Sequence, residues 1–139
     1  MKQRAGGRKG GRRRGSAMLE GGLSVGVFLT LFVTIMDYGR WAYINNLVPY
    51  LAREGTRYAI VHGSSSSSPE TTDGIKTYVQ GKAVGITPSD LTVTVTFTGA
   101  PGSTVKIVVT GYFSPLTPWL LTPGARPGYS ATSTMTILN

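Results

Sequence analysis

Residues 16–36 read Ser-Ala-Met-Leu-Glu-Gly-Gly-Leu-Ser-Val-Gly-Val-Phe-Leu-Thr-Leu-Phe-Val-Thr-Ile-Met. From Gly21 to Met36 this segment has no charged residue. As an α-helix, residues 16–36 would span about 31 Å, the thickness of one hydrocarbon core. The large apolar side chains favour insertion by roughly 3–5 kcal/mol in total, whereas Glu20 costs less near the end of a span than at its centre. The sequence therefore predicts one transmembrane helix that includes Glu20.

A basic run precedes this segment. Residues 1–15 hold seven of the 14 lysine and arginine residues, and the run ends in Arg-Arg-Arg-Gly, with Gly15 next to Ser16. Positive charges are retained on the cytoplasmic side of a membrane. We therefore expect residues 1–15 to be a cytoplasmic leader and residues after about 40 to lie outside. The run contains many glycines and no aromatic residue, which argues against a nucleic-acid partner.

Four residues after the apolar segment are typical of a membrane interface. Asp37, Tyr38, Arg40 and Trp41 combine charged side chains with aromatic rings, which prefer the headgroup region. Asp37 and Arg40 are three residues apart, a spacing that allows an ion pair on one helix face.

The helix is expected to continue to residue 62. Its apolar stripe has alternating spacings of three and four residues and consists of Trp41, Ile44, Val48, Leu51, Gly55 and Tyr58. Pro49 removes one backbone hydrogen bond and should bend the helix. Residues 63–68, one glycine and five serines, are expected to form a flexible linker.

Residues 69–139 are expected to form an exported domain. A capping serine, Ser67 or Ser68, and Pro69 in the first turn predict a helix over about 69–84. Alternation of apolar residues with threonine or serine predicts strands at about 91–98, 104–113 and 129–138. Such one-sided strands need a cover, which the two helices provide. The predicted fold is α+β: a long transmembrane helix continuing into a small domain, with a second helix packed on a three-stranded antiparallel sheet.

The segment 114–128 joins the last two predicted strands and contains Trp119, Leu120 and Leu121. Two interpretations remain open for these side chains. They could cover the edge of the sheet, or they could contact a partner subunit or the outer membrane leaflet.

No catalytic constellation is found in the sequence. His62 is the single histidine, read as a solvated residue at a helix end, and there is no cysteine, so neither a metal site nor a cofactor is expected. Glu20 has two interpretations. It could be a carboxylate that faces water at the end of the span, or it could neutralise a free amine at Ser16 after cleavage of the preceding bond, in its own chain or in a neighbour.

The N-terminal segment is compatible with three fates. A conventional secretory signal fits poorly, because no Ala-x-Ala-like site follows the long apolar run. An uncleaved anchor presenting a small extracytoplasmic interaction domain is the alternative function. The order of basic run, Gly15, Ser16 and Glu20 resembles a type IV prepilin processing site, which implies cleavage after Gly15 by a prepilin peptidase.

Residues 13–61 resemble the TadE-like pseudopilins of tight-adherence (Tad) pilus systems. The likeness is carried by Gly15-Ser16 with Glu20, by Asp-Tyr-Gly-Arg at residues 37–40 and by Ala-Arg-Glu-Gly-Thr-Arg-Tyr-Ala at residues 52–59. Gly21 and Gly22 depart from the bulkier apolar residues common in the family. The resemblance implies a minor, non-enzymatic pilin-like subunit that helps to assemble an adhesive pilus or a related secretion apparatus. Its implied partners are the prepilin peptidase, other pilin or pseudopilin subunits and the inner-membrane assembly platform. The implied location is the inner membrane, crossed once, or a surface pilus.

Overall fold

The computed structural model describes residues 11–116 and 126–137, with side chains from Gly15 onward. Its internal contacts divide the chain into two compact units, residues 1–36 and residues 37–139. Each unit is described by itself below. Helix α1 (Gly11–Val61) contributes to both of them.

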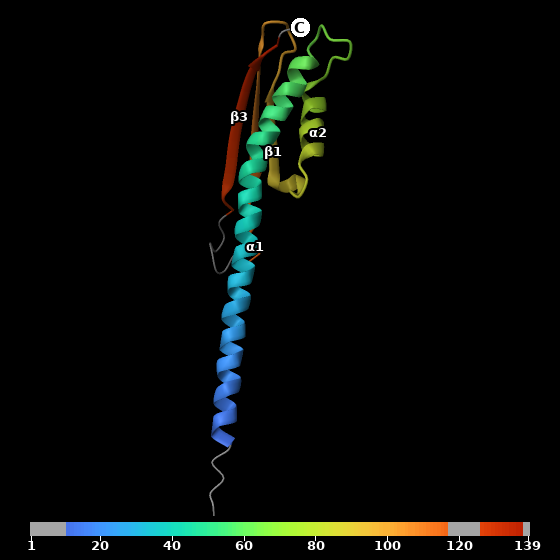
Figure 1. The fold of residues 1–139 in the computed structure, drawn as a ribbon. Helices are drawn as coiled ribbons and strands as arrows, with labels where there is room; N and C mark the ends of the chain where they lie inside the picture. The colour runs from blue at the N-terminus through green and yellow to red at the C-terminus, as the bar shows by residue number, and fades with distance from the viewer. Residues whose placement is uncertain (1–10, 117–125, 138–139) are drawn as a thin grey trace, which may run out of the picture. The chain divides into compact units, whose positions relative to one another are not determined.

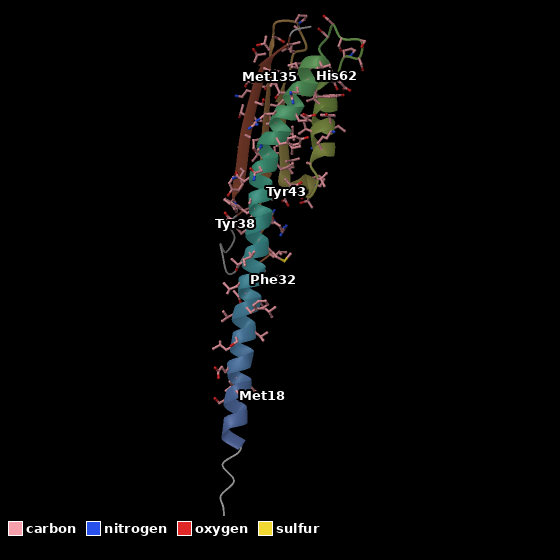
Figure 2. All side chains as sticks on the ribbon, viewed as in Figure 1. Met18, Phe32, Tyr38, Tyr43, His62 and Met135 are labelled. Carbon is pink, nitrogen blue, oxygen red and sulfur yellow. The ribbon has the colours of Figure 1, made fainter. Side chains whose placement is uncertain are left out.

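The first unit is the N-terminal part of α1. Most of its apolar side chains are exposed, as Figure 2 shows for Met18 and Phe32. The hydroxyls of Ser24, Thr30 and Thr34 donate to the carbonyl oxygens of residues 20, 26 and 30, at 2.8, 2.9 and 2.8 Å. Helix α1 is long and apolar enough to cross a membrane, which agrees with the predicted span.

The second unit combines the rest of α1 with one helix and a sheet (Figure 1). The elements after α1 are α2 (Thr72–Lys82), a 3-10 turn (Pro88–Asp90), β1 (Leu91–Thr96), β2 (Thr104–Tyr112) and β3 (Gly128–Thr136). Both strand pairings are antiparallel, in the order β1-β2-β3. The predicted α+β class, with a second helix and a three-stranded antiparallel sheet, is confirmed.

The register of the sheet places apolar residues together on one face. Val93 lies opposite Val109, and Val109 lies opposite Ala131 in β3. Val105 and Ile107 on the same face of β2 are fully buried. Threonines on the other face of β1, such as Thr92 and Thr94, are exposed. The strand alternation therefore identified the buried face correctly.

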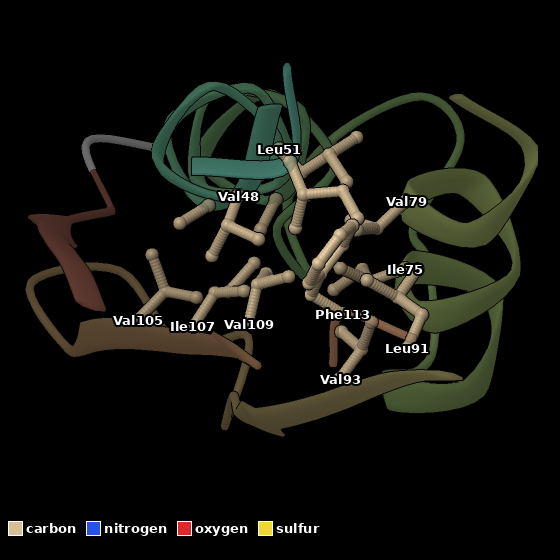
Figure 3. Close-up of a cluster of buried hydrophobic side chains, with 13 residues drawn as sticks. Val48, Leu51, Ile75, Val79, Leu91, Val93, Val105, Ile107, Val109 and Phe113 are labelled. Atoms are coloured by element: carbon tan, nitrogen blue, oxygen red, sulfur yellow. The ribbon is translucent and has the colours of Figure 1, made fainter. Parts of the chain in front are cut away.

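Both helices pack on the apolar face of the sheet. Figure 3 shows Val48 and Leu51 of α1 directed toward the side chains of β2, while Ile75 and Val79 come from α2. Leu51 and Ile75 are fully buried. The stripe expected on α1 is thus the surface that covers the sheet, and α1 runs through Pro49 without interruption.

One local expectation was wrong. Helix α2 begins at Thr72, because Thr71 is its N-cap and accepts a hydrogen bond from the N–H of Gly74 at 3.2 Å; neither Ser67 nor Ser68 caps it. A flexible linker at residues 63–68 stays a prediction. Ser64 donates from its backbone N–H and its hydroxyl to the carbonyl of Gly99, at 2.8 and 2.9 Å, which ties the segment to the β1–β2 turn.

Gly55 lets α1 approach both α2 and the sheet. A Cβ atom at this position would lie 2.6 Å from Val79 Cγ2 and 3.1 Å from Ile107 Cδ1. A Cβ at Gly81 in α2 would meet nothing within 4 Å. The same substitution should therefore have opposite effects at the two positions.

We expect Gly55→Ala to destabilise the folded unit, because overpacking costs typically about 1–3 kcal/mol and outweighs the gain in helix propensity. Gly81→Ala should stabilise it by roughly 0.5–1 kcal/mol, since only the propensity term applies. Thermal unfolding of the full chain in detergent, followed by circular dichroism, measures both. Equal shifts of the same sign would contradict the close approach at Gly55.

Candidate functional site

Gly15 and Ser16, the residues of the expected processing site, lie in helix α1 one turn after its first residue, Gly11. Both are exposed. Glycine lowers helix propensity by about 1 kcal/mol relative to alanine. The helix is therefore intrinsically weaker at Gly15, next to the expected scissile bond.

Glu20 lies one helical turn after Ser16 and is exposed. Side chains on a helix lean toward its N-terminus, so that of Glu20 leans back over the turn that contains Ser16. Within residues 11–116 and 126–137, Glu20 forms no ion pair. A carboxylate without an internal partner is thus placed one turn from the expected new N-terminus.

Asp37 is buried at the start of the second unit, with a side chain only 1% exposed. Both of its carboxylate oxygens accept the backbone N–H of Leu116, each at 3.0 Å. Nη1 of Arg40 lies 3.6 Å from Asp37 Oδ1, so the ion pair expected from the spacing is present. Asp37 therefore fixes the backbone after β2 to helix α1.

Trp41 completes this contact region. Its ring stacks on Tyr38 with a centroid distance of 5.4 Å, and its indole N–H donates to the hydroxyl of Tyr129 at the start of β3. The guanidinium of Arg40 lies 5.8 Å from the ring centroid of Phe113. We call Asp37, Arg40, Trp41, Phe113, Leu116 and Tyr129 the helix–sheet junction.

The junction gives two of the four expected interfacial residues a role in the fold. Asp37 is buried and Trp41 half-buried against protein, so these two stabilise the fold. Tyr38 and Arg40 are exposed. A place at the membrane interface stays a prediction for all four. Sequence reasoning missed Leu116 and Phe113, for which the local pattern holds no signal. Trp119, Leu120 and Leu121 lie outside the described residues.

A stack of rings links the end of α1 to α2. Tyr58 lies between Tyr78, at 3.9 Å, and His62, at 4.0 Å between ring centroids. The hydroxyl of Tyr58 donates to Glu70 and that of Tyr78 to Glu54, both at 3.1 Å. His62 is half-buried, with Nδ1 2.8 Å from the carbonyl oxygen of Tyr58, so reading it as merely solvated was wrong.

Partial burial raises the pKa of Tyr58 and of Tyr78, and the hydrogen bonds to Glu70 and Glu54 raise them further. A raised phenol pKa keeps the hydroxyl protonated, so both tyrosines remain hydrogen-bond donors at neutral pH. In the part of the chain that the structure describes, no cluster of three or more histidine, aspartate or glutamate side chains is placed to hold a metal ion.

Comparison with protein families gives one result. The model of a family described as TadE-like protein matches residues 15–57. Residues 15–57 are a TadE-like segment. The segment starts at the expected processing site, includes Glu20 and Asp37, and ends within the packed part of α1. The comparisons with curated proteins and with solved structures gave no match.

The TadE-like segment has two physically different parts. Up to residue 36 its side chains are mostly exposed and apolar. From Asp37 on, it presents buried residues to the sheet, among them Val48, Leu51 and the close-packed Gly55. It therefore supplies both a helix suited to a membrane and one layer of the folded unit.

Proposed function

We propose that the chain is a minor pilin-like subunit, cut after Gly15 by a prepilin peptidase, that takes part in assembling a Tad-type adhesive pilus or a related secretion apparatus. The TadE-like segment indicates a protein associated with a Tad pilus, with a structural rather than a catalytic role. The observation that carries the proposal is that this segment begins at Gly15, with Glu20 one helical turn after Ser16.

The chemistry at Glu20 supports this role. Cleavage would leave an ammonium group at Ser16, one turn from a carboxylate that has no ion pair within the described residues. Opposite charges attract strongly in an apolar setting, where either one alone is costly. The amine and Glu20 would pair in one chain or between neighbours, and the pair would fix the axial position of the helix during assembly.

The proposed location is the inner membrane. The basic leader would remain in the cytoplasm by the positive-inside rule, and residues after about 40 would lie in the periplasm or outside the cell. The membrane-spanning part of α1 would place the chain next to other pilin or pseudopilin subunits and the assembly platform. Passage into a surface pilus would follow from release of the same helix.

The proposal is tested by intact mass measurement of the chain extracted from the membranes of cells that make it. The mass should correspond to a chain that begins at Ser16. In a strain without prepilin peptidase activity, residues 1–15 should be retained. Retention of these residues in cells with an active peptidase would overturn the processed-subunit proposal and favour an uncleaved single-pass anchor.

A further inference from the structure

Helix α1 carries a second stripe, on the side opposite its buried one. Asn46, Tyr50, Arg53 and Arg57 recur at helical spacing and are all exposed. We call these four residues the arginine face. It is displaced by about half a turn from Val48, Leu51 and Gly55, which pack on the sheet. The fold therefore leaves the arginine face open.

The carboxylates of the folded unit are all engaged within it. Each described carboxylate from Asp37 onward has a partner: Asp37 bonds Leu116 and Arg40, Glu54 bonds Tyr78, Glu70 bonds Tyr58, Asp73 bonds Lys76, and Asp90 bonds Arg126. Arg40 and Arg126 are thus ion-paired. Within the described residues, Arg53, Arg57, Lys82 and Lys106 form no ion pair. Of these four, only Arg53 and Arg57 lie one turn apart on one helix.

The surface around these arginines is hollowed. One hollow of about 340 Å³ is lined by Asn46, Pro49, Tyr50, Arg53, Glu54 and Arg57. A second of the same volume is lined by Glu54, Arg57, Tyr58, Val61, His62 and Tyr78. They share Glu54 and Arg57 and therefore adjoin. Arg57 lies where the two hollows meet, and Tyr50, 51% exposed, borders the first.

We propose that the arginine face docks an acidic segment of another protein. Side chains four residues apart on a helix have Cβ atoms about 5–6 Å apart, a spacing that two carboxylates one turn apart on a partner helix reproduce. Each guanidinium offers a planar fork of donors that fits a carboxylate in a bidentate manner. Tyr50 adds an aromatic surface beside the charges, and tyrosine and arginine are among the residue types enriched at the hot spots of protein interfaces.

This inference does not depend on cleavage after Gly15, because all the residues involved belong to the second unit. Processing and docking therefore fail or succeed separately. A mass that begins at Met1 leaves the arginine face unaffected, and the loss of docking leaves the mass unaffected.

The test is site-specific photo-crosslinking of the full chain in the cells that make it. Tyr50→p-benzoyl-phenylalanine keeps an aromatic ring at the hollow and reacts with whatever lies against it. We expect a defined protein adduct whose crosslinked peptide carries at least two aspartate or glutamate residues one helical turn apart. Adding Arg53→Gln with Arg57→Gln should lower the yield by roughly fivefold or more, as expected for two partly exposed ion pairs.

A matched variant removes the same charge elsewhere. Lys82→Gln with Lys106→Gln changes two exposed lysines outside the arginine face and should leave the yield within about twofold, since surface substitutions away from a contact have small effects. Circular dichroism of both double variants checks that they are folded. The proposal is overturned if the adduct is with lipid or RNA, or if no adduct forms. It is also overturned if the crosslinked peptide lacks paired carboxylates, or if replacing the two arginines leaves the yield unchanged.

Discussion

Glu20→Ala should lower incorporation of the chain into the pilus assembly by about tenfold or more, while membrane insertion persists or improves. The carboxylate forms no ion pair within the described residues, so its removal should spare the fold. Membrane insertion should become more favourable, because an ionised side chain within an apolar span raises the free energy of insertion. Assembly should lose a charged contact of about 1.5–3 kcal/mol, which corresponds to at least a tenfold change in an equilibrium.

The measurement is the amount of variant and wild-type chain that co-purifies with the assembly machinery, relative to the amount in the membrane. Ser24→Ala is the matched control, because Ser24 is one turn further along the exposed part of α1 and bonds only to a backbone carbonyl. Its incorporation should match the wild type. Equal co-purification of Glu20→Ala and wild type would remove the pairing argument.

Asp37→Ala should destabilise the folded unit by about 1.5–3 kcal/mol, the range for hydrogen bonds to a charged group. The backbone N–H of Leu116 would lose both acceptor oxygens, which now lie at 3.0 Å. Arg40 should contribute little to the loss, because its side chain is 48% exposed and water would solvate the released charge. The expected fall in midpoint is roughly 6–20 °C for a unit of this size.

Thermal unfolding of the full chain in detergent, followed by near-ultraviolet circular dichroism, reports the change. Asp37→Asn should lower the unfolding midpoint less than Asp37→Ala does, since the amide oxygen still accepts one hydrogen bond. Asp73→Ala removes a carboxylate that is 88% exposed and should change stability by no more than about 0.5 kcal/mol. If Asp37→Ala and Asp73→Ala had the same midpoint, the buried contact with Leu116 would not contribute to stability.

The sequence predicted those parts of the fold that depend on neighbouring residues. Period-two alternation located the strands to within about two residues, because it reports directly which face of a strand is buried. Helical spacing located the stripe from Ile44 to Gly55 for the same reason. The start of α2 was misplaced, since Pro69 after serines is a common helix start, whereas the side chain of Thr71 makes the cap.

The helix–sheet junction could be predicted only in part. The pair of Asp37 and Arg40 follows from a spacing of three residues, and the structure contains it. The contact of Asp37 with Leu116 joins residues 79 positions apart. A local sequence pattern cannot predict a contact between residues so far apart. An acidic and aromatic sequence next to an apolar segment is typical of a membrane interface, and the burial of Asp37 is seen only in the tertiary packing.

The hydroxyls of Ser24, Thr30 and Thr34 are bonded to the backbone of their own helix. These hydroxyls therefore need no hydrogen-bond partner from lipid or from a neighbouring protein. Replacing one of these surroundings by the other would leave their hydrogen bonds unchanged. A subunit that passes from the bilayer into a growing fibre, or back, would therefore break none of these three hydrogen bonds.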